Sequence, residues 1–521
     1  MSLASLPESV PVLVAGGGPV GLAAAIELGQ RGIRCVVIEP RETVSHARPR
    51  CKTVNVATME HLRRWGVAGR LRERAPLPVA WSQDIVFCTS LSGRELSRFT
   101  GVLGLVPEGD RFAELGQQVP QYILEELLRE VAGELSCCSL ATGMTVTGLW
   151  QDQAGVRVTV TDAAGAQAVV SAGYVLGCDG PRSAVRAAIG AAYTGDHALR
   201  PNLGLVFQAP RLWQQVRHGP AVQYWIINPD APALMGPVDR SGTWWIIAFG
   251  VGRETSEHQA RQLIDAAAGV PVQASVLSTD PWTARMQIVD RMRRGRVFLA
   301  GDAAHLNPPF GGHGLNTGIG DAVDLGWKVA AVLDGWGGPA LLDSYETERR
   351  PVQERVIRAA TANMAVLSTE LLADNLEASD PAGERARRVA GARIQQTKKA
   401  EFHALDLVLG ASQEEAVQGS RLPHAWLGAG HSLYDELGPG LTLLVLGGDG
   451  SHAAIEHAAR VRSVPLAIAD LRGLRARYGA DLVLVRPDRQ VVWCGDQPPG
   501  DTLALIDHIR GAAAQAAAGR R

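Results

Sequence analysis

The stretch FLAGDAAHLNPPFGGHGLNTGIGDA, residues 298–322, combines a carboxylate with a run of glycines that could bind a ligand. Asp302 follows an apolar run, and Gly312 and Gly314 come just before a segment with helical periodicity. A glycine-rich loop ahead of a helix commonly holds an anion through its backbone N–H groups. The lysine of a phosphate-binding P-loop is missing here, so we expect a different ligand.

A second candidate site is the GxGxxG sequence formed by Gly16, Gly18 and Gly21, which lies between a strand-like run and a helix-like run. The first glycine permits a tight turn, the second lets a pyrophosphate approach the backbone, and the third lets helix and strand pack closely. Glu39 ends the next apolar run, where a carboxylate can accept hydrogen bonds from a ribose. The sequence therefore predicts a dinucleotide-binding βαβ unit at the start of the chain.

Two aspartates stand beside a glycine at the end of an apolar run, Asp179 in GCDGPRSAVR and Asp302 in FLAGDAAH. Taken singly, Asp179 is most simply explained as part of a turn. Whether the dinucleotide is NAD or FAD depends on these further motifs. With GxGxxG they make three such sites in one order along the chain, which coincidence does not explain.

These motifs, with PPFGGHGLNTGIGDAVDLGWK, resemble those of the flavin-dependent aromatic hydroxylases of the p-hydroxybenzoate hydroxylase type, over about the first 400 residues. The resemblance implies that Asp302 binds the ribityl chain of FAD. It also implies that backbone amides near Leu315 and Asn316, at a helix start, face the N1 and O2 edge of the flavin. A reduced flavin is negative at this edge, and a helix N-terminus favours negative charge. The glycine loop is therefore expected to hold the isoalloxazine ring.

Two further positions match the family pattern. Arg50 stands where an arginine near the flavin is usual, and Gln121 aligns with a glutamine on the ribityl side of FAD. The resemblance as a whole implies a cofactor-binding set of Gly16, Gly18, Pro19, Val20, Gly21, Glu39, Arg50, Gln121, Asp179, Asp302, Pro309, Gly312, Gly314, Leu315 and Asn316.

The resemblance also implies a reaction, in which NADPH or NADH reduces FAD and O2 adds at the flavin C4a position. The resulting hydroperoxide transfers one oxygen atom to an electron-rich aromatic substrate, which defines an FAD-dependent monooxygenase. The cofactor performs the hard steps, while the protein positions it and excludes water. Two alternatives stay open: Baeyer–Villiger or epoxidising oxygen insertion, and a flavin-bound binding or regulatory protein without turnover.

The segment expected to line the substrate pocket contains aromatic runs such as VQYWIINP and GTWWIIAFGV. Neighbouring side chains of a strand point to opposite faces, so at most one of Trp244 and Trp245 can face the pocket. The substrate-binding candidates are Tyr224, Trp225, Trp245, Trp282 and Pro309. The catalytic candidates are Arg50, Tyr224, Pro309 and His313. The aromatic segment, together with the resemblance of the C-terminal region to that of polyketide hydroxylases, implies a bulky polycyclic phenol of the kind found in antibiotic biosynthesis.

Strand-like runs alternate with helical segments, which predicts an α/β protein. We expect a discontinuous FAD-binding domain, Rossmann-like and of the GR2 type, over residues 1–80, 113–188 and 284–395. An inserted β-sheet domain for the substrate is expected over 81–112 and 189–283. Residues 400–521 resemble the thioredoxin-like domain of the phenol and polyketide hydroxylase branch, through RLPHAWL, SLYDELG and LVLVRPDRQVVW. That region contains no CxxC, so a packing role or a homodimer is expected rather than thiol redox chemistry.

The composition of the 521 residues, 46% hydrophobic and 20% charged with a net charge of −2, is that of a globular protein with no nucleic-acid partner. The N-terminus lacks the features of a signal peptide. The sequence contains no run of about eighteen apolar residues, so we expect no membrane-spanning helix. The seven cysteines have no disulfide-like spacing, which favours a reduced, cytoplasmic protein. The expected partner is a small aromatic substrate, with O2 and NADPH or NADH as co-substrates.

Overall fold

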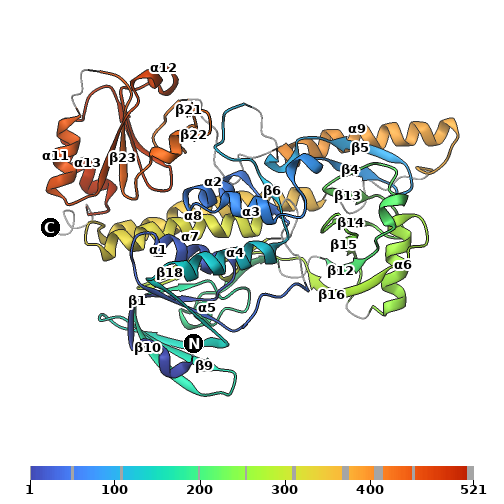
Figure 1. The fold of residues 1–521 in the computed structure, drawn as a ribbon, viewed down its shortest axis with the longest axis horizontal. Coiled ribbons are helices and arrows are strands. Elements are labelled where there is room, and N and C mark those ends of the chain that lie inside the picture. Colours follow the sequence, from blue (N-terminus) through green and yellow to red (C-terminus); the bar gives the residue numbers. More distant parts are fainter. Residues whose placement is uncertain are drawn as a thin grey trace.

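The structure is a computed structural model that describes residues 2–47, 52–105, 109–196, 200–252, 255–307, 312–365, 375–403, 415–448 and 452–512. Three bodies are visible in Figure 1: a parallel-sheet domain at the lower left, a second sheet at the right, and a C-terminal domain in red. The predicted α/β class is confirmed. Among the described residues, no helix combines the length and the apolar character that a membrane span requires.

The first domain is built on one large sheet. Its main strands are, in spatial order, β18 (Arg293–Arg294), β19 (Val297–Leu299), β10 (Gln167–Gly177), β1 (Ser9–Ala15), β2 (Cys35–Glu39) and β7 (Cys138–Thr142). The strands from β19 to β7 are parallel, and their apolar, largely buried residues are typical of strands covered on both faces. The antiparallel strands β8 (Met144–Gln151) and β9 (Val156–Asp162) continue the sheet from β10.

Four long helices pack beside this sheet: α1 (Pro19–Gly29), α4 (Gln121–Glu134), α7 (His313–Leu333) and α8 (Pro339–Ala365). Two glycines let α7 lie directly on α1. A Cβ at Gly318 would lie 2.7 Å from Val20 Cγ2, and one at Gly326 would lie 2.4 Å from Glu27 Cγ. The start of α7 is therefore held close to the start of α1, although the two helices are almost three hundred residues apart in sequence.

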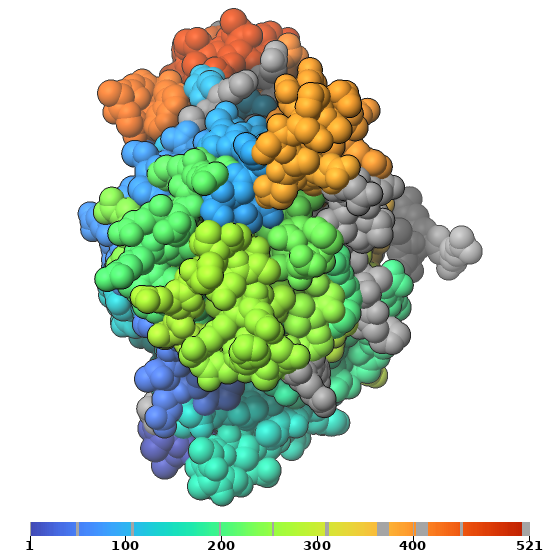
Figure 2. All heavy atoms as spheres, turned by 90° about the vertical axis from the view of Figure 1, so that its right-hand side faces the viewer, coloured from blue at the N-terminus to red at the C-terminus, as the bar shows by residue number. Residues whose placement is uncertain are grey.

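The second domain is a seven-stranded sheet. Its order is β16 (Ser275–Thr283), β12 (Pro201–Gln208), β15 (Thr243–Phe249), β14 (Ala233–Pro237), β13 (Gln223–Ile226), β4 (Ile85–Cys88) and β5 (Glu95–Phe99). Strand β4 pairs in parallel with β13. The sheet therefore joins β4 and β5, which come before β10 in the chain, to five strands that come after it. The face covered by α6 (Glu257–Ala268) is called the outer face below, and Figure 2 looks onto this end of the molecule, with α6 in lime green.

The opposite, inner face of the second sheet carries Trp225, Trp245 and Phe249. Part of it is covered by α9 (Pro381–His403), which contributes Ala390 and Ile394. We predicted that the chain up to residue 395 stays with the FAD-binding domain. In the structure α9 instead packs against the second sheet, because the apolar side chains on one side of α9 are buried against the aromatic side chains of that sheet.

The C-terminal domain has a four-stranded sheet in the order β24 (Leu466–Asp470), β23 (Leu441–Val445), β25 (Leu482–Val485) and β26 (Val491–Gly495), flanked by α11 (Ala453–Val461) and α13 (Thr502–Ile509). We expected three strands, and the third segment forms a hairpin of two. The turn includes Arg489, whose φ is +70°. Trp327 and Trp336 of the first domain join the core of this domain, so the two pack as one hydrophobic unit.

Shorter elements connect these bodies. They are β3 (Thr53–Val54), α2 (Val56–Arg64), α3 (Ala68–Arg74), β6 (Gln117–Gln118), α5 (Ala184–Ala188), β11 (Tyr193–Asp196), β17 (Met286–Val289), β20 (His305–Leu306), β21 (Trp426–Gly428), β22 (His431–Ser432) and α12 (Arg475–Tyr478). Strands β11, β17 and β20 form a small sheet of their own, and β3 pairs with β6.

Candidate flavin and substrate site

The GxGxxG turn between β1 and α1 has the geometry that a pyrophosphate requires. Gly16 has a φ of +99°, and its N–H donates to the Ile38 carbonyl at 2.8 Å. A Cβ at Gly21 would lie 1.9 Å from the Gly16 oxygen, so this position must be glycine. At Gly18, by contrast, a Cβ would meet no atom within 4 Å. The turn is tight on the protein side and open at the N-terminus of α1, where an anion would bind.

Glu39 lies beside this turn and holds it in place. Its Oε2 accepts the Gly17 N–H at 2.7 Å, and its Oε1 accepts the backbone N–H and the Nε of Arg41 at 3.0 and 2.6 Å. Arg41 also bridges to Glu125 on α4 at 2.8 Å. Oε2 keeps a lone pair for a ribose hydroxyl, so the geometry is compatible with the predicted role. The sequence analysis missed Arg41 and Glu125, which fix the carboxylate.

Asp179 follows β10 at the same edge of the sheet. Its Oδ2 accepts the Val185 N–H at the start of α5 at 3.1 Å, while its buried Oδ1 has no hydrogen-bond partner in the described part of the chain. Burial raises the pKa of Asp179, against the opposing effect of the Ser183 hydroxyl and the N–H groups of α5. A buried polar atom without a partner marks a place where a bound group would supply the missing bond.

Asp302 lies close to the GxGxxG turn in space. It follows Gly301, whose φ is +58° and where a Cβ would lie 2.9 Å from Val20 Cγ2. The Asp302 residue is exposed, and its carbonyl accepts a hydrogen bond from the Tyr193 hydroxyl. The structure therefore brings the two predicted cofactor motifs together at one edge of the sheet.

Gly312, whose φ is +66°, precedes the first turn of α7, and a Cβ at Gly314 would meet no atom within 4 Å. The N–H groups of a first helical turn have no partner within the helix, so they suit an anionic group placed there. The Asn316 side chain is fully used inside the protein. Its Oδ1 accepts from the Asn55 N–H at 3.0 Å and the Thr58 hydroxyl at 2.8 Å, and its Nδ2 donates to the Thr53 and Gly312 carbonyls. Asn316 thus shapes the loop.

A buried carboxylate that the sequence analysis did not predict anchors this region. Asp321 accepts hydrogen bonds from His305 at 2.7 Å, Gly301 at 3.2 Å, Arg349 at 2.8 Å and Gln353 at 3.1 Å. Burial alone would raise the pKa of Asp321, but Arg349 and His305 outweigh it and lower the pKa. The signal in the sequence that could have indicated this anchor is a carboxylate among the apolar residues of α7.

His313 is the first residue of α7 and is buried. Its Nε2 has no hydrogen-bond partner among the residues that the structure describes. Burial lowers the pKa of His313 to about 4, so the imidazole is neutral near pH 7. A neutral imidazole can accept a hydrogen bond from a ligand hydroxyl. Gln121 begins α4, which packs against α1. Arg50 and Pro309 lie outside the described residues.

The prediction that Trp244 and Trp245 face opposite ways is confirmed. Trp244 lies in the core beneath α6, and Trp245 lies on the inner face. Tyr224 also lies beneath α6, where its hydroxyl donates to the Gly219 carbonyl and accepts the Ala221 N–H. We predicted that Tyr224 contacts substrate and acts in catalysis. Its position corrects this, because Tyr224 is adjacent in the strand to Trp225, and only one of two neighbours can face inward.

On the inner face around β12, a glycine lies between polar and aromatic side chains. Gly204 is partly exposed in the middle of it. On β12, Asn202 is paired with both Trp282 and Phe249, so these side chains share the face with it. The buried Oδ1 of Asn202 has no hydrogen-bond partner in the described residues, and neither has Trp245 Nε1. The sequence analysis predicted Trp245 and Trp282 here and missed Asn202.

Lys52 connects this face to the flavin loop. Its Nζ lies 3.7 Å from the centroid of the Trp245 ring, a cation–π contact. The next residue, Thr53, accepts the hydrogen bond from Asn316 near the start of α7. The inner face and the start of α7 are therefore neighbours, as a site that joins flavin and substrate requires.

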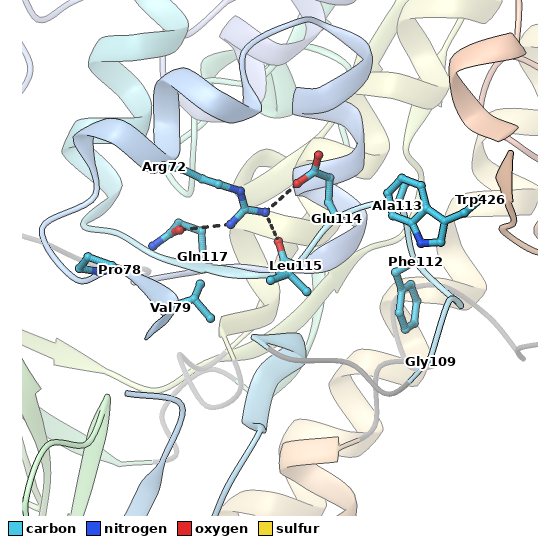
Figure 3. A pocket seen from close by; sticks show the side chains of 10 residues that line it. All are labelled: Arg72, Pro78, Val79, Gly109, Phe112, Ala113, Glu114, Leu115, Gln117 and Trp426. Atoms are coloured by element: carbon cyan, nitrogen blue, oxygen red, sulfur yellow. Dashed lines mark hydrogen bonds and ion pairs between the residues drawn. The ribbon is translucent and has the colours of Figure 1, made fainter. Parts of the chain in front are cut away.

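A separate cavity of about 550 Å³ lies between the first domain and the C-terminal domain (Figure 3). Its walls include Phe112, Leu115 and Trp426, and Arg72 crosses it to contact Glu114 and Gln117. None of the motif residues of the flavin turn lines this cavity, so it is distinct from the flavin site.

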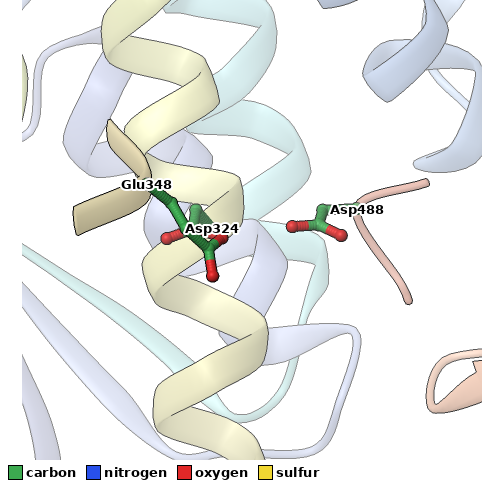
Figure 4. A group of neighbouring side chains, drawn as sticks. All are labelled: Asp324, Glu348 and Asp488. Atoms are coloured by element: carbon green, nitrogen blue, oxygen red, sulfur yellow. The ribbon is translucent and has the colours of Figure 1, made fainter. Parts of the chain in front are cut away.

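A cluster of carboxylates lies where α7 and α8 meet the C-terminal domain (Figure 4). Oxygens of Asp324, Glu348 and Asp488 lie within 4.8 Å of one another. Lys328 Nζ lies 2.9 Å from Asp324 and 3.1 Å from Glu348, and Arg486 lies 2.6 Å from Glu348. Two cations therefore already neutralise most of the charge, and the cluster joins domains rather than forming a metal centre.

Comparison with known proteins agrees with this geometry. Residues 9–360 match the family described as FAD binding domain, and residues 415–515 match that described as aromatic-ring hydroxylase, C-terminal. The chain therefore belongs to the FAD-binding aromatic-ring hydroxylases, and the predicted family is confirmed. It is an FAD-dependent monooxygenase, which uses NAD(P)H and O2.

Three relatives show how far the likeness extends. Tetracenomycin A2 monooxygenase-dioxygenase of Streptomyces glaucescens is 31% identical over 551 residues, which cover 95% of each chain. The structure of the rebeccamycin biosynthetic enzyme RebC with reduced flavin superposes with a TM-score of 0.90 at 33% identity, over 98% of this chain and 100% of that chain. A ternary complex of aklavinone-11 hydroxylase with FAD and aklavinone superposes with a TM-score of 0.79 at 27% identity, over 96% and 98% of the two chains.

Proposed function

We propose that this monooxygenase hydroxylates a polycyclic phenolic substrate of the polyketide type, with NADPH as reductant, in the cytoplasm. The observation that carries the proposal is the inner face of the second sheet. Gly204 is partly exposed and carries no side chain, Trp245 and Trp282 lie on the same face, and the buried Asn202 Oδ1 accepts no hydrogen bond from any described residue. A flat ring system that carries a hydroxyl fits such a face in shape and in hydrogen bonding.

Two further observations support the substrate class and the location. The relatives named above carry tetracenomycin, rebeccamycin and aklavinone in their names. The six cysteines in the described part of the chain are free thiols, as is usual for cytoplasmic proteins.

The chain offers binding groups for the pyrophosphate, the adenosine ribose, the ribityl chain and the flavin edge of FAD, which when bound would accept electrons from NADPH and activate O2. The open backbone at Gly18 and the N-terminus of α1 would hold the pyrophosphate, and Glu39 the adenosine ribose. Asp302 would bind the ribityl chain, and the first turn of α7 would face the flavin edge. The unpartnered Asp179 Oδ1 lies at the same sheet edge, so the donor set fits the cofactor.

The remaining residues orient the substrate and exclude water. Trp245 and Phe249 supply an apolar wall, which keeps water away from the reacting atoms. The neutral His313, whose Nε2 is without a partner in the described residues, would accept a hydrogen bond from the phenol hydroxyl and so orient the ring. Its low pKa makes it a positioning group rather than a strong base.

The test is NADPH consumption under air by the purified protein, with and without a panel of monocyclic and polycyclic phenols, with flavin absorbance followed in the same sample. We expect polycyclic phenols to accelerate flavin reduction by at least about tenfold over monocyclic ones and to yield a product heavier by one oxygen. NMR of the product separates ring hydroxylation from Baeyer–Villiger insertion or epoxidation. Acceleration by monocyclic phenols only would refute the proposed substrate class, and no acceleration by any phenol would refute the proposed function.

A further inference from the structure

Helix α9 presents a buried ion pair to the aromatic side chains of the inner face. Ala390, Ile394 and Phe402 lie on the apolar stripe of this helix. Lys398 and Glu401 continue the same stripe by spacings of three and four residues, which place side chains on one helix face. Both charged side chains are fully buried, and Lys398 Nζ donates to Glu401 Oε2 at 2.7 Å.

Aromatic rings surround this pair. Lys398 Nζ lies 5.3 Å from the centroid of the Trp225 ring, and Phe402 lies 6.3 Å from the same ring. Trp225 is stacked on Phe87 at 5.4 Å and belongs to the same hydrophobic cluster as Trp245. The pair therefore lies on the sheet-facing side of α9, next to the hydrophobic cluster of the inner face that also contains Trp245.

One oxygen of the pair is unsatisfied. Glu401 Oε1 is buried and accepts no hydrogen bond from any described residue. Burial raises the pKa of Glu401, against the opposing effect of Lys398. Replacing a buried ion pair by apolar residues of similar volume is often neutral or stabilising, so stability alone does not account for the pair. A ligand group that donates to Oε1 would complete the bonding.

We propose that Glu401, held by Lys398, recognises a hydroxyl group of the polycyclic substrate and so determines which ring system binds. The inference rests on the proposed function and adds a specificity-determining residue to it. A hydroxyl donates to the carboxylate Oε1, whereas an O-methyl ether at the same position has no proton to donate and adds volume. Discrimination between the two is the property that a purely structural ion pair would not produce.

The experiment uses the FAD-loaded full chain with alizarin and its two mono-O-methyl ethers as probes. Dissociation constants come from the change in flavin absorbance on binding, and KM and kcat from NADPH oxidation. The variants are Glu401→Gln and the double variant Lys398→Met with Glu401→Leu, which removes both charges and keeps the volume. Glu384→Gln on the same helix is the control, because the Glu384 side chain is 68% exposed.

We expect the wild-type protein to bind alizarin about tenfold more tightly than the less favoured ether, since one hydrogen bond to a charged group has about this effect. The double variant should bind all three probes within about twofold and keep its FAD content. Glu401→Gln should lie between, and Glu384→Gln should behave as the wild type.

Two outcomes would overturn the inference: equal binding of the three probes by the wild type, or a preference that survives in the double variant. Both are distinct from a failure of the proposed function, which would appear as NADPH oxidation that no polycyclic phenol accelerates in the wild type.

Discussion

The flavin loop and the inner face of the second sheet differ in how their polar side chains are held. Two side chains that anchor the loop make four hydrogen bonds each, whereas three side chains on the inner face keep an atom without a partner in the described residues. Asp321 accepts hydrogen bonds from four residues, and the Asn316 amide makes four hydrogen bonds. On the inner face, Asn202 Oδ1, Trp245 Nε1 and Glu401 Oε1 lack partners in the described chain. The protein thus holds the anchors of the cofactor half in place. Asp179 Oδ1 and His313 Nε2 in that half, and the three atoms of the inner face, are left for ligands to complete.

Asp321→Ala should produce the largest effect, because it removes the carboxylate that accepts four hydrogen bonds beside the flavin loop. Arg349 and His305 would lose a buried partner, and breaking a buried ion pair costs about 3–5 kcal/mol. We expect loss of bound FAD and a clear drop in the unfolding temperature, measured by flavin absorbance and differential scanning fluorimetry. Asp470→Ala is the control, since the Asp470 side chain is 61% exposed. Wild-type FAD content in Asp321→Ala would contradict the anchoring role.

The two glycines of the nucleotide turn should respond differently to the same change. Gly21→Ala places a Cβ 1.9 Å from the Gly16 oxygen, so we expect a destabilisation of about 1–3 kcal/mol or more in the flavin-free protein. Gly18→Ala meets no protein atom, so it should leave the flavin-free protein unchanged and weaken FAD binding about tenfold. Chemical unfolding and flavin titration measure the two effects. A Gly18→Ala protein with unchanged FAD affinity would exclude the pyrophosphate from this position.

On the inner face, Asn202→Ala should weaken substrate binding and leave FAD binding unchanged. It removes an acceptor that no described residue uses, so the cost should appear in KM, by about tenfold, with FAD affinity unchanged. Steady-state NADPH oxidation with the best polycyclic phenol measures KM, and flavin titration measures the cofactor. Asn228→Ala is a matched control in the same domain, because Asn228 lies after the end of β13. Equal loss of FAD and substrate affinity would remove the distinction between the halves.

The smallest effect is expected at the domain junction, as a pH dependence. Burial raises the pKa of Asp324 to about 7, despite Lys328, whereas Arg486 overcomes burial and lowers the pKa of Glu348 and of Asp488. The folded protein therefore retains a proton on Asp324 that the unfolded chain has lost, and this contribution to stability disappears as pH rises through about 7. The side chain of Asp324→Asn is neutral at every pH. The unfolding temperature of this variant minus that of the wild type should therefore rise by about 1–2 °C as the pH is raised from 5 to 8. A constant difference across this range would contradict the raised pKa.

Much of the cofactor half could be predicted from the sequence, because its signals are local. Gly16, Gly18 and Gly21 act through backbone geometry within one turn, and Asp179 and Asp302 each follow a buried strand. The alternation of Trp244 and Trp245 is a property of any strand, and it was correct. Which of the two alternating sets of side chains faces the inner side of the sheet depends on how the sheet packs, and not on the strand sequence. The assignment of Tyr224 to the substrate was wrong for that reason.

The sequence by itself determined the α/β class and the nucleotide turn, since these depend on residue type and short spacing. The resemblance of its motifs to a known family implied the cofactor. Only the tertiary structure decided the rest. Asp321 is joined to Gly301, His305, Arg349 and Gln353 by contacts between separate elements. Likewise α9 leaves the first domain and places Lys398 and Glu401 among the aromatic rings of a sheet formed much earlier in the chain. Such partners are chosen by the packing of helices and sheets against each other, and no short pattern in the sequence specifies that packing.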